Sequence, residues 1–357
     1  MKLRVKRRNK RVEQESRERE IPEVQKPSES PKPPAARRFP KVQTALAAAA
    51  VLLFAAVMCI VPEEIRPAWV SEWLAGMTAG ASSAESPDAA QLEVIYLDVG
   101  QADSILLRLP DGRNMLIDAG NNADGAKVAA YLQSIGVTRL DWVVGTHPHE
   151  DHIGGLDTVI AQMKVGRVLL PEIPDDQVPT TRTYMDVLDA MAAKNLRADA
   201  AKAGRVLVRD RTNDLKIQVL SPQAGAKFDG LNNYSVVLRL TYGSCSFLFT
   251  GDAETAAEAA MLASGAELHA DVLKLGHHGS STSTSQAFLD RVHPQYAIIS
   301  CGKGNDYGHP HKETLARIRS SGAQLYRTDR QGGLRVTCSG TSITVETGLP
   351  SCDGNAA

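Results

Sequence analysis

The sequence predicts an α+β domain between residues 91 and 349, in which helices pack against layered β-sheets. Short apolar runs rich in β-branched residues, such as LEVIYLDVG (92–100) and SVVLRLTYG (235–243), are bounded by Gly, Pro or Asp and are typical of strands. Segments with helical spacing, such as GAKVAAYLQSIGV (125–137), occur between them. Because hairpins are expected at both ends of the domain, the sheets are not expected to be purely parallel.

The expected elements follow one another along this domain. The expected strands cover residues 92–100, 103–109, 114–120, 140–147, 166–172, 216–222, 235–243, 244–252, 271–279, 296–302, 323–329, 333–338 and 342–347. The expected helices cover residues 125–137, 180–195, 253–265, 284–292 and 311–322.

Residues 1–43 are predicted to be a disordered, basic, cytoplasmic tail. They contain 14 Lys and Arg against six Asp and Glu, and include polar stretches such as KPSESPKPP (26–34). Such a segment cannot bury enough apolar surface to offset the entropy lost on ordering. Since the whole chain has a net charge of −1, the remainder of the chain is acidic.

Residues 44–61, TALAAAAVLLFAAVMCIV, contain no charged residue and are predicted to form a transmembrane anchor. A helix of this length spans about 27 Å, close to the hydrocarbon thickness of a bilayer. A cleaved signal peptide fits less well, because the preceding basic region is long and the small residues at 79–81 lie far downstream. Basic residues precede the helix and acidic residues follow it, which predicts a single-pass protein of the cell membrane with its N-terminus in the cytoplasm and the large domain outside.

Residues 62–90 are small, polar and predicted to be a flexible linker, and residues 350–357 form a short tail. None of the five cysteines forms a Cys-x-x-Cys pair, which argues against a zinc ribbon. Cys338 and Cys352 flank the last expected strand and could form a disulfide if this part is extracytoplasmic.

The strongest chemical signal is the segment HPHEDH, residues 147–152, which comes directly after an apolar run. Alternation along an extended segment places His147 and His149 on the same side. Asp151 and His152 follow at a turn, where they could face a second ion. Imidazole and carboxylate groups suit zinc and also accept manganese or iron. The pattern therefore predicts a divalent metal site rather than a polar surface turn.

Followed by Ile-Gly-Gly, this segment resembles the signature of the metallo-β-lactamase superfamily. The extracellular hydrolase-like domain of the ComEC family of competence proteins has similar motifs in the same order. In this chain they are LDVGQADS (97–104), LIDAG (116–120), NNYSVVLRL (232–240), FLFTGDAE (247–254), LKLGHHGS (273–280) and NDYGHP (305–310). The resemblance covers about residues 92–347, but not the multi-helix DNA channel of that family. It implies an αββα sandwich with the site at one edge of two facing sheets, and a connection to the competence machinery.

The resemblance also implies two divalent ions, zinc or manganese. His147 and His149 would hold the first ion, and Asp151 and His152 would hold the second. Asp252 would bridge the two ions. On its own, Asp252 could equally be the N-cap of the helix that follows it.

A histidine of GHHG would complete the second site, with His277 favoured and His278 as the alternative. Asp118 would orient a ligand imidazole from behind, which fixes the tautomer of that ring. Many members of the superfamily carry a further histidine before the strand that leads to Gly-Asp, and this chain has none there. A neutral oxygen or a water would take the place of this histidine, so the first site is expected to bind its ion more weakly than a site with three histidines. The candidate residues for this oxygen are Asn232, Asn233 and Ser235.

The implied reaction is attack by a metal-activated water on a phosphodiester. Asp151 would orient the water, and His309 would supply a proton or a positive charge to the leaving oxygen. Ser280, Ser281 and Lys303 are candidate phosphate contacts. The motif LDVGQADS contains the polar residues Asp98, Gln101 and Asp103. They either shape the floor of the site or order a tight turn.

The charge balance limits the substrate. Residues 91–357 carry 25 basic and 30 acidic side chains, whereas proteins that hold long DNA present a basic surface. Short single-stranded DNA or nucleotides therefore fit better than long duplex. Two alternatives remain open: a hydrolase of esters, lactones or β-lactams, and a non-catalytic binding module in DNA uptake.

Overall fold

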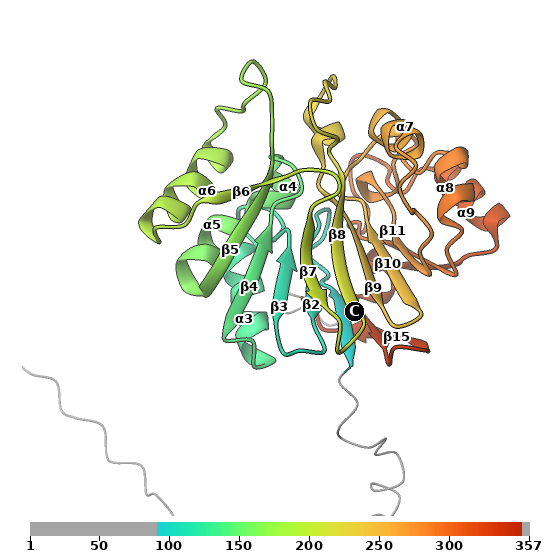
Figure 1. Cartoon of the computed structure of the whole chain (residues 1–357), viewed down its shortest axis with the longest axis horizontal. Coiled ribbons are helices and arrows are strands. Elements are labelled where there is room, and N and C mark those ends of the chain that lie inside the picture. The colour runs from blue at the N-terminus through green and yellow to red at the C-terminus, as the bar shows by residue number, and fades with distance from the viewer. Residues whose placement is uncertain (1–90, 352–357) are drawn as a thin grey trace, which may run out of the picture. The chain divides into compact units, whose positions relative to one another are not determined.

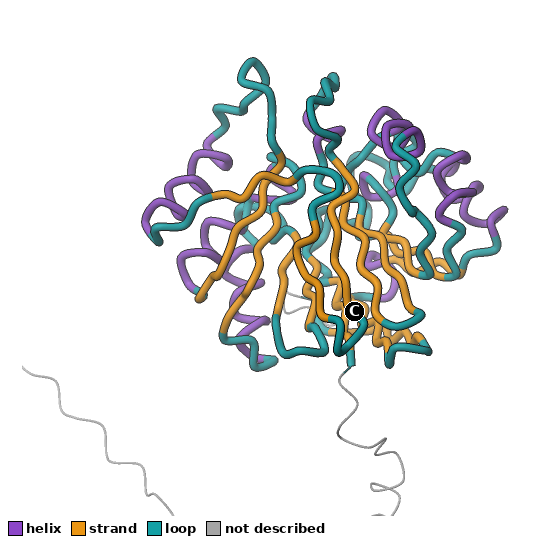
Figure 2. Tube along the Cα trace, in the orientation of Figure 1, coloured by secondary structure: helices purple, strands orange, loops and turns teal. Residues whose placement is uncertain are grey.

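The computed structural model describes residues 91–351, which form two facing β-sheets with helices on both outer faces (Figure 1). Figure 2 shows the same layers by type of secondary structure. This arrangement confirms the α+β sandwich expected from the sequence. The predicted tail, anchor and linker lie outside the described residues. Within residues 91–351, no helix is both long and apolar enough to cross a membrane.

The first sheet contains eight strands: β1 (Leu92–Tyr96), β2 (Ile105–Arg108), β3 (Asn114–Ile117), β4 (Arg139–Val144), β5 (Lys164–Pro171), β6 (Ala198–Ala201), β14 (Gly333–Cys338) and β15 (Ile343–Leu349). Their order in the sheet is β15-β14-β1-β2-β3-β4-β5-β6. The pairs from β15 to β3 are antiparallel, and those from β3 to β6 are parallel.

The second sheet contains seven strands: β7 (Val206–Asp210), β8 (Leu215–Ser221), β9 (Val237–Tyr242), β10 (Cys245–Phe249), β11 (Val272–Lys274), β12 (Tyr296–Ile299) and β13 (Gln324–Arg327). Here β7 to β10 form antiparallel pairs, and β10 to β13 form parallel pairs. Both sheets thus combine an antiparallel part with a parallel part, as the mixed pattern of the sequence predicts.

Helices cover the parallel part of each sheet on its outer face (Figure 1). The first sheet is covered by α3 (Gly125–Ser134), α4 (Glu150–Ile153), α5 (Leu156–Gln162) and α6 (Arg182–Ala193). The second is covered by α7 (Thr255–Ala263), α8 (Gln286–Val292) and α9 (Lys312–Ser321). The remaining short turns of helix are η2 (Leu231–Tyr234), η3 (His277–Gly279) and α10 (Thr328–Gln331).

The sequences of the strands are almost continuous apolar runs, because both faces of each strand are buried. In β1, Val94 and Tyr96 belong to the core between the two sheets, whereas Ile95 points to the core under the helices. Successive side chains of a strand point to opposite faces, so one strand contributes to both cores. These cores hold the loops at the carboxyl ends of the strands in fixed positions.

Two strands and several short helices were not expected from the sequence. β6 has the sequence ADAA, without a β-branched residue, and is a strand because it pairs with β5. β7 is short and carries charged side chains, and it pairs with β8 through an irregular register. α5 has seven residues and follows α4 directly, which leaves too short a pattern to recognise. Tertiary pairing and packing, rather than local propensity, therefore define these elements.

The sequence left open a pairing of Cys338 with Cys352, and this pairing is wrong, because a disulfide joins Cys338 to Cys245. Ser244, in the turn before β10, donates its N–H to the carbonyl oxygen of Gly340, in the turn after β14 (2.7 Å). This contact brings together two turns that belong to different sheets, so that their neighbouring cysteines meet. Cys352 itself lies outside the described residues.

Candidate metal centre

The candidate site lies where strands of both sheets end. β4 leads into HPHEDH, β10 leads to Asp252, and β11 leads to the turn that contains His277 and His278. β3 ends just before Asp118 in the same region. Sites of layered α/β proteins commonly lie at the carboxyl ends of parallel strands, where loops from several strands converge. Only the fold brings these segments together, because about a hundred residues separate HPHEDH from Asp252.

The Gly-Gly pair after HPHEDH permits a close approach of two loops. A Cβ atom at Gly155 would collide with the carbonyl oxygen of Ala119, and one at Gly154 with the backbone nitrogen of Asn122. This approach allows the N–H of Ala119 to donate to the carbonyl oxygen of His152 (2.8 Å). The loop that carries Asp118 is thereby held against the loop that carries the histidines.

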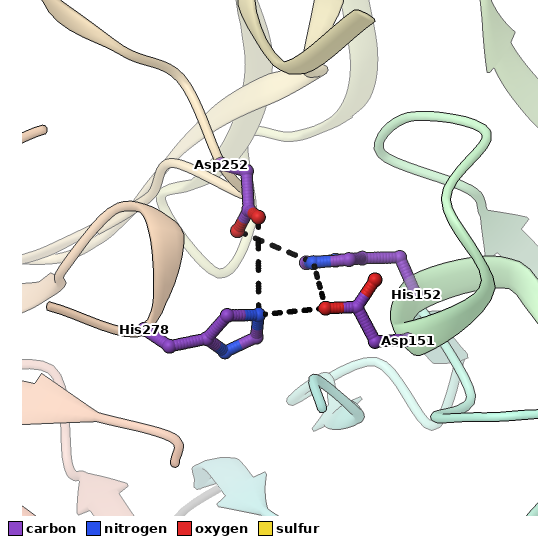
Figure 3. Close-up of side chains that lie close together, drawn as sticks. All are labelled: Asp151, His152, Asp252 and His278. Atoms are coloured by element: carbon purple, nitrogen blue, oxygen red, sulfur yellow. Dashed lines mark hydrogen bonds and ion pairs between the residues drawn. The ribbon is translucent and has the colours of Figure 1, made fainter. Parts of the chain in front are cut away.

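Asp151, His152, Asp252 and His278 form a compact group whose ligand atoms all lie within 4.8 Å of one another (Figure 3). His152 Nε2 lies 3.2 Å from Asp252 Oδ1, and His278 Nε2 lies 3.1 Å from Asp151 Oδ2. All but Asp151 are buried, and the side chain of Asp151 is 31% exposed. The group therefore combines two imidazole nitrogens with two carboxylates, one of them facing solvent.

Asp118 lies behind His152, as expected from the sequence. Its Oδ2 accepts from His152 Nδ1 (2.8 Å) and from the hydroxyl of Thr146 (2.7 Å), while its Oδ1 accepts from the Thr146 N–H (2.8 Å). A proton of the His152 ring is consequently held on Nδ1, and Nε2 is the ring nitrogen that faces the group. This is the usual role of a carboxylate behind a metal-binding histidine.

His278 is oriented in the same way by a different partner. Its Nδ1 donates to the backbone carbonyl of Ser300 (3.0 Å), which turns Nε2 toward Asp151. Asp103 lies 3.5 Å from the same Nδ1 and forms a buried ion pair with Lys274 (2.7 Å). Asp103 also donates its backbone N–H to the carbonyl of Asp151 (3.0 Å). Asp103 therefore connects the first motif of the domain to both ends of the group.

His277 turns one ring nitrogen toward Glu254 and the other toward Asp252. Its Nδ1 lies 3.2 Å from both Glu254 Oε1 and the hydroxyl of Thr282, and its Nε2 is 3.8 Å from Asp252 Oδ2. The sequence favoured His277 over His278 as the ligand of the second ion, whereas the ring that lies within the group of Asp151, His152 and Asp252 is that of His278. Both residues have positive φ angles, 48° and 51°, and this tight turn sends the two side chains in different directions.

His147 and His149 lie beside Asp252 and form the other half of the site. His147 Nε2 is 3.0 Å from His149 Nδ1 and 3.8 Å from Asp252 Oδ2. The hydroxyl of Ser235 is 3.4 Å from His147 Nδ1 and accepts from the Asp252 N–H (3.0 Å). Ser235 therefore positions His147 and Asp252 from behind and does not point into the centre.

The two asparagines considered as substitutes for a third histidine have different environments. Asn233 Oδ1 accepts from the N–H groups of Glu254 and Ala257, at the start of α7, so it caps that helix. Asn232 lines the cavity above the group, and its buried Oδ1 has no hydrogen-bond partner within residues 91–351. Of the oxygens expected to complete the first site, only that of Asn232 is available.

The charges of the group favour the binding of a cation. Burial opposes ionisation of Asp252, but His152 and His278 outweigh it and hold the pKa of Asp252 well below its usual range. Burial likewise opposes protonation of His152, yet the carboxylates of Asp252, Asp151 and Asp118 raise its pKa well above the ordinary value. His147 behaves in the opposite way, because burial and the neighbouring His152 lower its pKa. The buried carboxylates are thus stabilised by neighbouring positive charge.

The donor set fits a divalent metal ion. His152 Nε2 and Asp252 Oδ1 are buried and lack a hydrogen-bond partner in the described part of the chain, although they lie only 3.2 Å apart. Buried polar atoms are rarely left in this state, and a cation between them would satisfy both. Nitrogen and carboxylate ligands suit zinc and manganese. The His and Asp clusters can therefore hold metal ions.

A cavity of about 350 Å³ opens above the group. It is lined by Gln101, His149, Glu150, Asp151, Asn232, Asp252, His277, His278, Tyr307 and His309. His309 is thus beside the metal-binding group, as expected. Gln101 also lies in this wall, whereas Asp98 accepts from the N–H of Gly100 (3.2 Å) and orders the turn.

The three expected phosphate contacts lie elsewhere. Ser280 is buried, and its hydroxyl is 3.1 Å from that of Thr282. Ser281 is exposed and donates its N–H to His311 Nδ1 (2.9 Å). Lys303 is exposed and is not among the residues that line the cavity. Within residues 91–351, none of the three side chains reaches the cavity wall.

Sequence reasoning missed four residues that shape the site: Thr146, Glu254, Lys274 and Tyr307. Lys274 is the last residue of the apolar strand β11, and Thr146 follows the apolar strand β4. A polar side chain in such a buried run needs a polar partner, and this need could have drawn attention to both residues. Glu254 and Tyr307 belong to motifs that were recognised, but their neighbours were chosen instead. Their roles depend on side-chain direction, which the pattern of residues does not reveal.

Residues 97–303 match the family model described as the metallo-beta-lactamase superfamily. The chain is 33% identical over 264 residues to ComE operon protein 3 of Bacillus subtilis, a match that covers 68% of this chain and 32% of that protein. It is 31% identical over 285 residues to competence protein ComA of Neisseria gonorrhoeae, covering 79% and 37%. Recombination protein 2 of Haemophilus influenzae is 31% identical over 250 residues, covering 68% and 28%.

The chain spans about a third of the length of these curated relatives, so the match concerns one part of each. The relatives are ComEC-family competence proteins, and the resemblance inferred from the motifs is confirmed. The order of the motifs, the two-sheet sandwich and the His and Asp group agree with one another. The chain therefore belongs to the metallo-beta-lactamase superfamily.

Proposed function

We propose that this protein is a metal-dependent phosphodiesterase that cleaves short single-stranded DNA or nucleotides. Its relatives include competence proteins, and we propose that it acts in the same setting, attached to the cell membrane by residues 44–61 with the domain outside. The non-catalytic alternative is less favoured, because the residues expected to bind metal converge into one group of ligand atoms.

The observation that carries this proposal is the composition of the cavity wall. The residues that line it are carboxylates, imidazoles, amides and one phenol, with no aliphatic side chain among them. Pockets that hold neutral organic substrates are predominantly apolar. A polar wall above a cation-binding floor suits a phosphodiester better than a lactone, an ester or a β-lactam. The same wall contains no Lys or Arg within the described part, which argues against long duplex DNA.

The ligands proposed for two divalent ions, zinc or manganese, are His147 and His149 for one ion and Asp151, His152 and His278 for the other, with Asp252 shared. Bound there, such ions supply Lewis-acid polarisation of the phosphate and lower the pKa of water. The partly exposed carboxylate of Asp151 is placed to accept a hydrogen bond from the attacking water and to orient it.

His309 is held as a neutral hydrogen-bond donor. Gln101 Oε1 accepts from the N–H of Gly302 (3.0 Å), so the amide nitrogen of Gln101 faces His309 Nδ1 at 3.3 Å and donates to it. The proton of the ring is therefore on Nε2. Burial and the neighbouring His277 and His278 lower the pKa of His309 to about 4. The expected positive charge is absent near neutral pH, and we propose that Nε2–H donates to the leaving oxygen.

The test is hydrolysis by the purified full chain, loaded with zinc or with manganese. Short single-stranded DNA, bis(p-nitrophenyl) phosphate and a chromogenic cephalosporin are compared as substrates. We expect cleavage of both phosphodiesters and not of the lactam. Asp252→Asn should abolish it, whereas Asp186→Asn, a change at a partly exposed side chain of helix α6, should not. If neither phosphodiester is cleaved with either metal, the proposed function is wrong.

A further inference from the structure

An aromatic side chain stands at the rim of the cavity without being buried. Tyr307 is 70% exposed and is one of three large apolar side chains exposed in residues 91–351, with Val178 and Met185. It is also one of the residues that line the cavity. An exposed ring next to a binding cavity costs apolar hydration that a folded protein normally avoids, and such rings commonly serve recognition.

The loop that presents Tyr307 is held by hydrogen bonds. The amide nitrogen of Asn305 donates to the carbonyls of Gly302 (2.9 Å) and His309 (2.7 Å), and its oxygen accepts from the His309 N–H (2.9 Å). His311 Nε2 lies 3.2 Å from the carbonyl oxygen of Tyr307. The exposure of the ring is therefore imposed by a well-connected loop, which fixes its position relative to the cavity.

The ring continues a row of nearly parallel rings that starts at the metal-binding group. The His278 and His309 rings are 6.2 Å apart with an interplanar angle of 25°. The His309 and Tyr307 rings are 5.6 Å apart with an angle of 21°. Tyr307 is the last ring of this row, and its surface is mostly exposed to solvent. A planar ligand group can stack there while the group attached to it reaches the cavity floor.

The charge of the cavity indicates which planar group would be bound. Its described lining residues include Glu150, Asp151 and Asp252 but no Lys or Arg, so the protein offers little attraction to a phosphate backbone apart from bound cations. Affinity for a nucleotide must then come from another part of it. Base stacking on aromatic side chains supplies such affinity and tolerates any sequence, because every base has a π-face.

We propose that Tyr307 is a nucleobase-stacking subsite, which binds the base next to the phosphodiester held at the cavity floor. This inference rests on the proposed function and names its substrate class: single-stranded nucleic acid with an unpaired base. A base within a duplex is already stacked on both faces and cannot occupy the subsite.

The experiment compares two strands of equal length and charge, ten thymidines and ten abasic tetrahydrofuran units, with the full chain loaded with manganese. For Tyr307→Ala we expect KM for the thymidine strand to rise about 5- to 100-fold, the range for loss of one stacking contact. KM for the abasic strand should stay unchanged. Tyr307→Phe keeps the ring and should resemble the parent protein on both strands. An equal change on both strands, or on neither, would overturn the subsite.

The two proposals can fail separately. If the parent protein cleaves neither strand, the proposed function fails, and the subsite is then tested by fluorescence anisotropy with the same labelled strands. A preference for thymidine over abasic DNA that Tyr307→Ala removes and Tyr307→Phe retains would preserve the subsite. Equal binding of the two strands by the parent protein would overturn it. Thermal melting of each variant checks that the exposed substitution leaves the fold intact.

Discussion

His152 Nε2 lies 3.2 Å from Asp252 Oδ1 inside the protein, and neither atom has a hydrogen-bond partner within residues 91–351. We expect zinc or manganese to satisfy both atoms and to stabilise the folded chain. At a free metal concentration of 100 times Kd, this linkage amounts to about 2.7 kcal/mol. Thermal melting with and without metal measures it, and Asp252→Asn should remove most of the increase in Tm. An equal increase in that variant would place the metal elsewhere, while Asp186→Asn, far from the site in sequence and partly exposed on α6, serves as the control.

The two neighbouring histidines of GHHG should differ in their effect on metal content. His278→Ala removes a nitrogen 3.1 Å from Asp151 Oδ2, and we expect it to lower the amount of metal retained per chain. His277→Ala removes a ring whose nearest polar partners are Glu254 and Thr282 and whose Nε2 lies 3.8 Å from Asp252 Oδ2, so we expect it to lower the metal content less than His278→Ala does. Atomic emission spectroscopy after dialysis measures both. The opposite order of the two variants would restore His277 as the ligand.

The sequence could place Asp151 and His152 in a candidate metal site, because their chemistry and spacing in HPHEDH form a pattern that few other arrangements produce. It could add Asp252 only through the resemblance to the superfamily, because that aspartate alone could equally cap a helix. It could not choose between His277 and His278, since they are adjacent in sequence and only the turn decides which ring enters the group. It could not pair Cys338 with Cys245, because 93 residues separate them and two turns of different sheets bring them together. The strands of the buried core were predictable from their apolar runs. β6 was not, because its pairing with β5 overrides a sequence with low strand propensity.

Removing one partner of the buried ion pair between Lys274 and Asp103 should destabilise the protein more than removing both partners. Both are fully buried and 2.7 Å apart. Lys274→Met leaves the Asp103 carboxylate without a cation, which typically costs about 3–5 kcal/mol. The double variant Asp103→Asn, Lys274→Met removes both charges and should recover much of this loss. Urea unfolding measures the three proteins, and similar stability of the single variant and the parent would show that the pair contributes little.

The same pair predicts how the stability of the metal-free protein depends on pH. Burial opposes ionisation of Asp103, but Lys274 and His278 outweigh it and lower the pKa of Asp103 to about 2. Because the folded pKa lies below the unfolded value of 3.8, the stabilisation is present above about pH 4 and is lost as the pH falls toward 2. The stability advantage of the parent over the double variant should therefore shrink across this interval, as measured by urea unfolding at each pH. An advantage that stays constant would contradict the assignment.

The disulfide between Cys245 and Cys338 should stabilise the folded domain, because it links the start of β10 in one sheet to the end of β14 in the other. Closing a loop of this length restricts the unfolded chain, and removing such a bond typically costs about 2–5 kcal/mol. We expect Cys245→Ser and Cys338→Ser each to lower the free energy of unfolding by this amount under oxidising conditions. The parent protein should lose the same stability on addition of dithiothreitol, whereas the two variants should respond little to it. Cys352→Ser is the matched control, and if it destabilises the protein as strongly as Cys245→Ser does, Cys338 is paired with Cys352 instead.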